Sequence, residues 1–181
     1  MPVYKNKRYV MWVIAIVGFI AALYLTEYPP YGKASVKLHN DGYGTFDMTN
    51  YDGKIVESVL KNTDDMQVYY KYYICDFIFI AMFAFFQYMV TTAIGKLRQE
   101  KILRVGFVLI AVRALLDAIE NVSLIIVTNN FPALSYRLVN LSSIITKFKF
   151  ICMGAWFVTI IVMMIVRKRK PIRTGLHNEN F

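Results

Sequence analysis

Four strongly polar residues interrupt an apolar segment in the stretch Arg113-Ala114-Leu115-Leu116-Asp117-Ala118-Ile119-Glu120-Asn121. At about 100° of rotation per residue, the four polar side chains share one face of an α-helix. A charge near the centre of a bilayer costs roughly 2.5–3.5 kcal/mol on insertion scales, so this face must turn toward protein or water. The stretch therefore predicts a membrane-embedded helix with a functional site on its inner face.

The composition indicates a small polytopic membrane protein. Of the 181 residues, 57% are hydrophobic and 15% are aromatic, and the mean hydropathy is +0.42. These values are more typical of a membrane protein than of a soluble domain. About 20 apolar residues are enough to span a bilayer as a helix. We expect an all-α membrane fold, a single domain of residues 1–181, with a bundle of four transmembrane helices at about 9–26, 73–94, 105–128 and 143–166.

Basic residues predict the orientation of these helices. Lysine and arginine cluster before the first segment, in the loop between the second and third segments, and in the tail 167–181. Because cytoplasmic flanks carry the excess of lysine and arginine, we expect an integral protein of the plasma or cytoplasmic membrane with both termini cytoplasmic. The net charge of +9 then reflects contact with anionic headgroups on that side. A nucleic-acid partner is not expected, whereas a membrane-protein partner remains open.

The extracytoplasmic region 27–72 is too long to be a plain connector. Residues 34–39 alternate small or apolar residues with polar ones, residues 40–44 supply turn residues, and residues 45–48 fit a returning strand. This pattern predicts a short β-hairpin.

A short helix is expected after the hairpin, over about residues 51–60, with Thr49 or Asn50 as its N-cap. A further helix is expected to run from Met66 without a break into the second span. Four tyrosines at this junction are typical of an aromatic belt in the headgroup layer or of a ligand entrance. They are Tyr69, Tyr70, Tyr72 and Tyr73.

Two other predicted spans carry charges at similar depth. Asp76 lies in the second span, and the fourth span contains Lys147 and Lys149. The two lysines are about 200° apart around the helix, so only one of them can face the bundle. We expect Lys149 inside, because Lys147 is shallower and can extend toward the interface. The predicted ligand-binding residues are therefore Asp76, Arg113, Asp117, Glu120, Asn121 and Lys149.

A succession of short motifs covers roughly residues 46 to 150. It comprises Phe46-Asp47-Met48, Asn50-Tyr51, the tyrosines up to Tyr73, Asp76, Asp117-x-x-Glu120-Asn121 and Thr146-x-x-Lys149. This succession resembles a group of small, uncharacterised four-helix integral membrane proteins. The resemblance implies the four-helix architecture and supplies no activity.

Three classes of function fit the sequence. In the first, an outward-opening polar site within the membrane binds an ion or a polar or lipid headgroup. In the second, the charges only fix helix packing in a structural, immunity or accessory membrane subunit. The third is an intramembrane enzyme in which Asp117 and Glu120, one turn apart, divide the roles of acid and base.

The enzyme interpretation is the weakest of the three. The sequence has no recognisable pair of nucleophile and base, no glycine-rich phosphate loop and no histidine or cysteine metal motif. A divalent cation on Asp76, Asp117 and Glu120 is the metal site that the residue types allow. No other cofactor is predicted.

Overall fold

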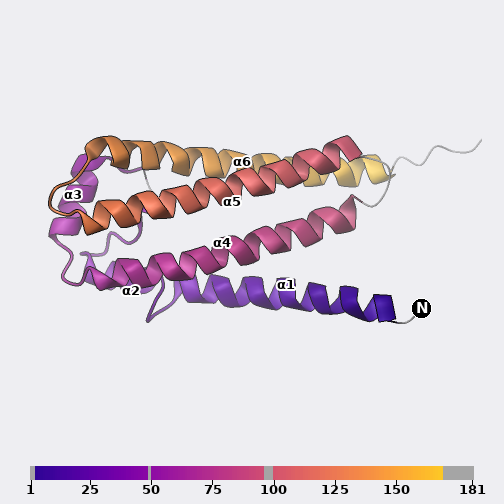
Figure 1. Ribbon diagram of the computed structural model, residues 1–181, viewed down its shortest axis with the longest axis horizontal. Coiled ribbons are helices and arrows are strands. Elements are labelled where there is room, and N and C mark those ends of the chain that lie inside the picture. The colour runs from indigo at the N-terminus through magenta and orange to yellow at the C-terminus, as the bar shows by residue number, and fades with distance from the viewer. Residues whose placement is uncertain (1–2, 49, 96–99, 169–181) are drawn as a thin grey trace, which may run out of the picture.

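The computed structural model describes residues 3–48, 50–95 and 100–168, which contain six α-helices, one 3-10 helix and no β-strand (Figure 1). The loop 96–99 and the tail 169–181, which hold much of the basic charge used to predict orientation, lie outside these residues. The elements are α1 (Val3–Glu27), α2 (Lys33–His39), η1 (Phe46–Met48), α3 (Gly53–Lys61), α4 (Gln67–Ile94), α5 (Glu100–Asn129) and α6 (Tyr136–Lys168).

Four long helices run side by side at the four predicted positions. Three contain stretches long and apolar enough to cross a membrane, namely Lys7–Glu27 in α1, Gln67–Ile94 in α4 and Tyr136–Ile165 in α6. The fourth, α5, has 30 residues but is interrupted by the charges of Arg113, Asp117 and Glu120, all of which are buried.

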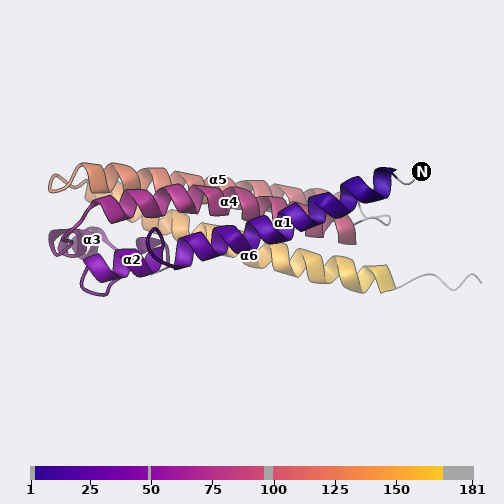
Figure 2. The ribbon, with the colours of Figure 1, turned by 90° about the horizontal axis from the view of Figure 1, so that it is seen from below.

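The long helices form an open arc in the order α1, α4, α5, α6 (Figures 1 and 2). The most extensive interface joins α5 and α6, and α4 packs along both α1 and α5. Within the described residues, α1 makes no comparable contact with α5 or α6. The bundle is therefore not closed into a ring.

One aromatic cluster attaches α1 to α4. The ring of Phe19 stacks on those of Phe83 and Phe86, with centroids 5.2 and 5.0 Å apart. Gly18 allows this approach, because a Cβ there would come within 2.8 Å of the terminal methyl of Met82. The opposite side of α1 is exposed in the described part of the chain, as at Val10, Val17 and Tyr24.

The predicted β-hairpin is wrong, since residues 33–39 form α2 and residues 46–48 form η1. So short an alternating run does not distinguish a strand from a helix. Of the two larger apolar residues of α2, Val36 is buried and Leu38 is 76% exposed. The turn residues instead end α2, because Asp41 has a φ of 53° and Gly42 donates its N–H to the carbonyl of Lys37 at 3.0 Å.

The helix α3 forms near its predicted place, but Asp52 caps it. The carboxylate of Asp52 accepts a hydrogen bond from the N–H of Ile55 at 2.9 Å, so Asn50 does not have the predicted role, and Thr49 lies outside the described residues. Val56 and Leu60 are buried on the inner face of α3, which packs against α6. Together, α2, η1 and α3 make a cap at one end of the bundle (Figure 1).

Three of the four tyrosines at the start of α4 belong to the core under this cap. Tyr69, Tyr72 and Tyr73 are each at most 2% exposed and pack with Phe46 of η1. Asn40 donates a hydrogen bond to the hydroxyl of Tyr69 at 2.8 Å. The prediction of an aromatic belt is therefore wrong for these three residues, which hold the cap on the bundle.

Because Leu60 is fully buried in this core, Leu60→Ala should destabilise the cap by about 2–5 kcal/mol, the usual cost of such a cavity. Faster hydrogen exchange of the α3 amides would report the loss. Ile55→Ala is the matched control, because Ile55 is 37% exposed on the same helix. Equal exchange rates in the two variants would contradict the packing described here.

Candidate functional site

A buried ion network joins α5 to α6. The Lys149 ammonium lies 2.8 Å from Asp117 Oδ1 and 2.5 Å from Glu120 Oε2. On the other side, Arg113 Nη1 donates to Asp117 Oδ2 at 2.9 Å. All four side chains are buried, and Glu120 is completely so. Asp117 is thus neutralised through both of its oxygens.

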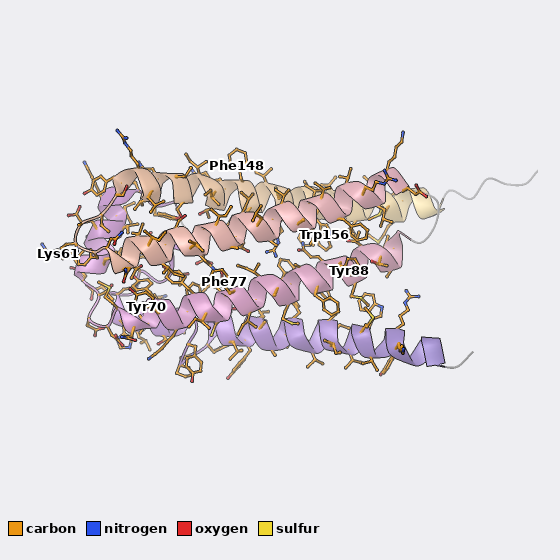
Figure 3. All side chains as sticks on the ribbon, in the orientation of Figure 1. Lys61, Tyr70, Phe77, Tyr88, Phe148 and Trp156 are labelled. Carbon is orange, nitrogen blue, oxygen red and sulfur yellow. The ribbon has the colours of Figure 1, made fainter. Side chains whose placement is uncertain are left out.

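Helix periodicity explains why these groups meet. Arg113 and Asp117 are four residues apart, and Asp117 and Glu120 are three apart, so all three lie on one face of α5. Lys149 reaches them from α6, whereas Lys147 is exposed, which confirms the orientation expected from the sequence. Figure 3 shows the same division on α6, where Phe148, between the two lysines, points away from the bundle and Trp156, about two turns farther along, points into it.

A second set of hydrogen bonds connects this network to the cap. The hydroxyl of Thr146 donates to the Glu120 carboxylate. One turn earlier on α6, Ser142 Oγ accepts a hydrogen bond from the hydroxyl of Tyr51 at 2.9 Å. Burial raises the pKa of Tyr51 to about 12, so this hydroxyl stays protonated and remains a donor at neutral pH. The cap therefore contacts the residues that position Glu120.

Asp76 is the exception among the buried acids of the bundle. The amide of Asn121 donates to Asp76 Oδ2 at 2.7 Å, but Asp76 forms no ion pair with a basic residue in the described part of the chain. Asp76 is nevertheless buried, with only 5% of its surface exposed. An uncompensated carboxylate in such a place is costly to the fold.

A cavity of about 210 Å³ lies beside Asp76 between the helices and the cap. It brings together Asp76, Arg113, Asp117 and Lys149 of the predicted site. Glu120 and Asn121 do not line it but contact Lys149 and Asp76 from behind. The lining residues are Thr26, Glu27, Lys33, Asp47, Asp76, Phe79, Phe83, Arg113, Asp117, Lys149, Phe150 and Met153.

The sequence suggested that residues 27–72 cover such a cavity but did not indicate which charged side chains of this region line it. Lys33 at the start of α2 lies 3.0 Å from Glu27 Oε1 and 3.7 Å from Asp47 Oδ2. Although burial lowers the pKa of Lys33, Asp47 and Glu27 raise it more, and the net direction is upward. Asp47 stood in one of the motifs quoted above, but nothing in its spacing indicated that η1 would carry it to the bundle.

The charges of the cavity are unbalanced. Its lining includes four acidic and three basic side chains, and Glu120 adds a further carboxylate behind Lys149. Arg113 is occupied on two sides, because its guanidinium also lies 4.5 Å from the ring centroid of Phe83. Acidic groups therefore outnumber basic groups in the site, and Asp76 is the acid that forms no ion pair in the described part of the chain.

The carboxylates are not arranged as a metal centre. Among the described residues, no group of three histidine, cysteine, aspartate or glutamate side chains could hold a metal ion. Lys149 lies between the carboxylates of Asp117 and Glu120, where a cation shared by them would have to lie. Cys75 and Cys152 are both free.

Comparisons of the chain with protein-family models, with curated proteins and with solved structures found no match. The function is therefore inferred from the residues of the site itself.

Removing the charge of Lys149 should leave Glu120 buried without its cation, at a cost of roughly 3–5 kcal/mol. Lys149→Met should thus lower the midpoint of thermal unfolding in detergent, and adding Glu120→Gln should recover part of the loss. Lys147→Met is the control, since Lys147 is exposed. Wild-type stability of both single variants would refute a stabilising role for the network.

Proposed function

We propose that this is a four-span membrane protein in which α5 crosses the membrane together with α1, α4 and α6. The support is the outer face of α5, which is apolar over about 30 Å at 1.5 Å per residue, the thickness of a bilayer core. Its charges lie on the opposite face and are paired with one another or with α6. The exposed apolar residues alternate at spacings of three and four, namely Val105, Val108, Val112, Leu115, Ile119, Val122 and Ile126.

The cap is proposed to lie outside the cell, with both termini in the cytoplasm. The described basic residues at the start of α1 and of α5, which include Arg8, Lys101 and Arg104, lie at the end of the bundle opposite the cap (Figure 1). This arrangement agrees with the excess of lysine and arginine found on cytoplasmic flanks.

The cavity is proposed to bind a positively charged polar group, either a cation or an amine headgroup, that arrives from the cap side. Asp76 carries this proposal, because it lines the cavity and has no basic partner in the described residues. Binding sites commonly retain such groups at a cost to stability. A charged ligand would supply the missing partner.

The alternative of a purely structural subunit is supported by a different observation. Asp117 is neutralised on both sides by Arg113 and Lys149, which suits a network that fixes the packing of α5 on α6. That interpretation explains Asp117 and Glu120 but leaves Asp76 without a role. The enzyme interpretation has less support, because Asp117 and Glu120 are held by the same lysine instead of occupying separate environments.

The orientation can be tested with single cysteines in a variant lacking Cys75 and Cys152. A membrane-impermeant thiol reagent applied to intact cells should label Lys37→Cys, which is exposed in the cap. A cysteine added at the C-terminus should react only after the cells are opened. Labelling of both positions in intact cells would mean that the number of spans is wrong.

Asp76→Asn should weaken the binding of glycerophosphoethanolamine, a water-soluble compound that carries the amine, by about ten- to hundredfold. This is the value of one hydrogen-bonded charge contact, about 1.5–3 kcal/mol. Calorimetric titration of the detergent-solubilised protein measures the change, and unfolding temperature should not fall. Glu100→Gln, at an exposed carboxylate on α5, is the control. Equally tight binding of glycerol 3-phosphate, which lacks the amine, would overturn the proposal.

A further inference from the structure

The open side of the helix arc coincides with the cavity. Thr26 and Glu27 of α1 line one side of the cavity, and Phe150 and Met153 of α6 line another. In the described part of the chain these two helices do not pack along each other. A gap between two spans at this depth is filled by the acyl chains of lipids, because no water is present there. In the proposed orientation, the side of the cavity between α1 and α6 therefore faces the bilayer, and its other end lies against the cap.

The cavity extends from the cap to the middle of the bilayer. Lys33 and Asp47 belong to the cap, whereas Phe150 lies near the middle of the apolar stretch Tyr136–Ile165 of α6. Its long axis thus has the direction of a lipid in the outer leaflet.

The chemistry of the lining changes along this axis. Asp47 and Asp76 are nearest the cap, and Arg113 lies deeper, because its guanidinium reaches the carbonyl of Ile80, one turn beyond Asp76 on α4. Apolar side chains complete the deeper walls on α4 and α6, namely Phe79, Phe83, Phe150 and Met153. Toward the cap, Asp47 and Asp76 lie with Lys33, and deeper in the cavity Asp117 is paired with Arg113 and Lys149. Asp76 is thus the acid of the lining that forms no ion pair in the described residues, and the walls beyond it are largely apolar.

We propose that the cavity takes an amine-bearing phospholipid from the outer leaflet, which enters between α1 and α6. The inference rests on the binding function proposed above and names its ligand class. In this arrangement the amine lies at Asp76, which has no basic partner in the described residues, and the acyl chains lie in the gap along the apolar side chains of Phe150 and Met153. The excess of acidic groups disfavours an anionic lipid.

Native mass spectrometry of the full-length protein in detergent tests the inference with three probes. They are dioleoyl phosphatidylethanolamine, dioleoyl phosphatidylglycerol and glycerophosphoethanolamine. The first should bind at least tenfold more tightly than the second, which lacks the amine, and than the third, which lacks the acyl chains. Asp76→Asn should remove the preference for the amine-bearing lipid.

Two adjacent substitutions on α6 test entry from the side. Met153→Trp should fill the cavity and reduce binding of phosphatidylethanolamine at least tenfold, because Met153 lines it. Gly154→Trp should bind normally, since Gly154 is exposed and a side chain there meets open space. Met153→Phe is a smaller change and should reduce lipid binding partly. It replaces the tryptophan variant in the test if that variant does not fold.

The outcomes separate this inference from the function on which it rests. If phosphatidylethanolamine and glycerophosphoethanolamine bind equally, or Met153→Trp binds lipid normally, the site recognises a headgroup alone and sideways entry is refuted. Tighter binding of phosphatidylglycerol would overturn the assignment of the amine. Failure of both amine-bearing probes to bind would remove the inference and the proposed function together.

Discussion

The ion pairs of Lys149 with Asp117 and Glu120 are the constraint on which the rest of the bundle depends. Alone, α5 would bring three charges into a bilayer, at roughly 2.5–3.5 kcal/mol each near the centre. Beside α6 the same charges are paired, and the exposed face of α5 from Val105 to Ile126 is apolar. The most extensive helix interface of the described residues joins these two helices, while α4 packs on α5 and α1 packs on α4.

Helical periodicity made the long elements and much of the site predictable. One period of 3.6 residues places Arg113, Asp117 and Glu120 on the same side of α5, and the 200° between Lys147 and Lys149 leaves one lysine inside. The cap was less predictable, because a run as short as residues 34–39 fits a helix or a strand until its neighbours are known. The position of Asp47 in the cavity was not predictable for a similar reason, because it depends on how η1 packs and not on any spacing in the sequence.

The buried acids of the bundle differ in what they require. Asp117 and Glu120 have their cations within the protein, so their cost is offset by the fold itself. Asp76 has only the amide of Asn121 and an opening to the cavity. A buried carboxylate that forms no ion pair within the described residues marks where an external group would contribute most.

The hydrogen bond from Tyr51 to Ser142 has a consequence for how the molecule unfolds. The same hydroxyl of Tyr51 lies 3.4 Å from Thr146 Oγ1, and the Thr146 hydroxyl donates to the Glu120 carboxylate. Loss of order in the cap would then remove Tyr51 from the two α6 hydroxyls beside a carboxylate that has no access to water. The cap and the charged centre should accordingly behave as one cooperative unit, with a single melting transition instead of an independent loss of the outer layer.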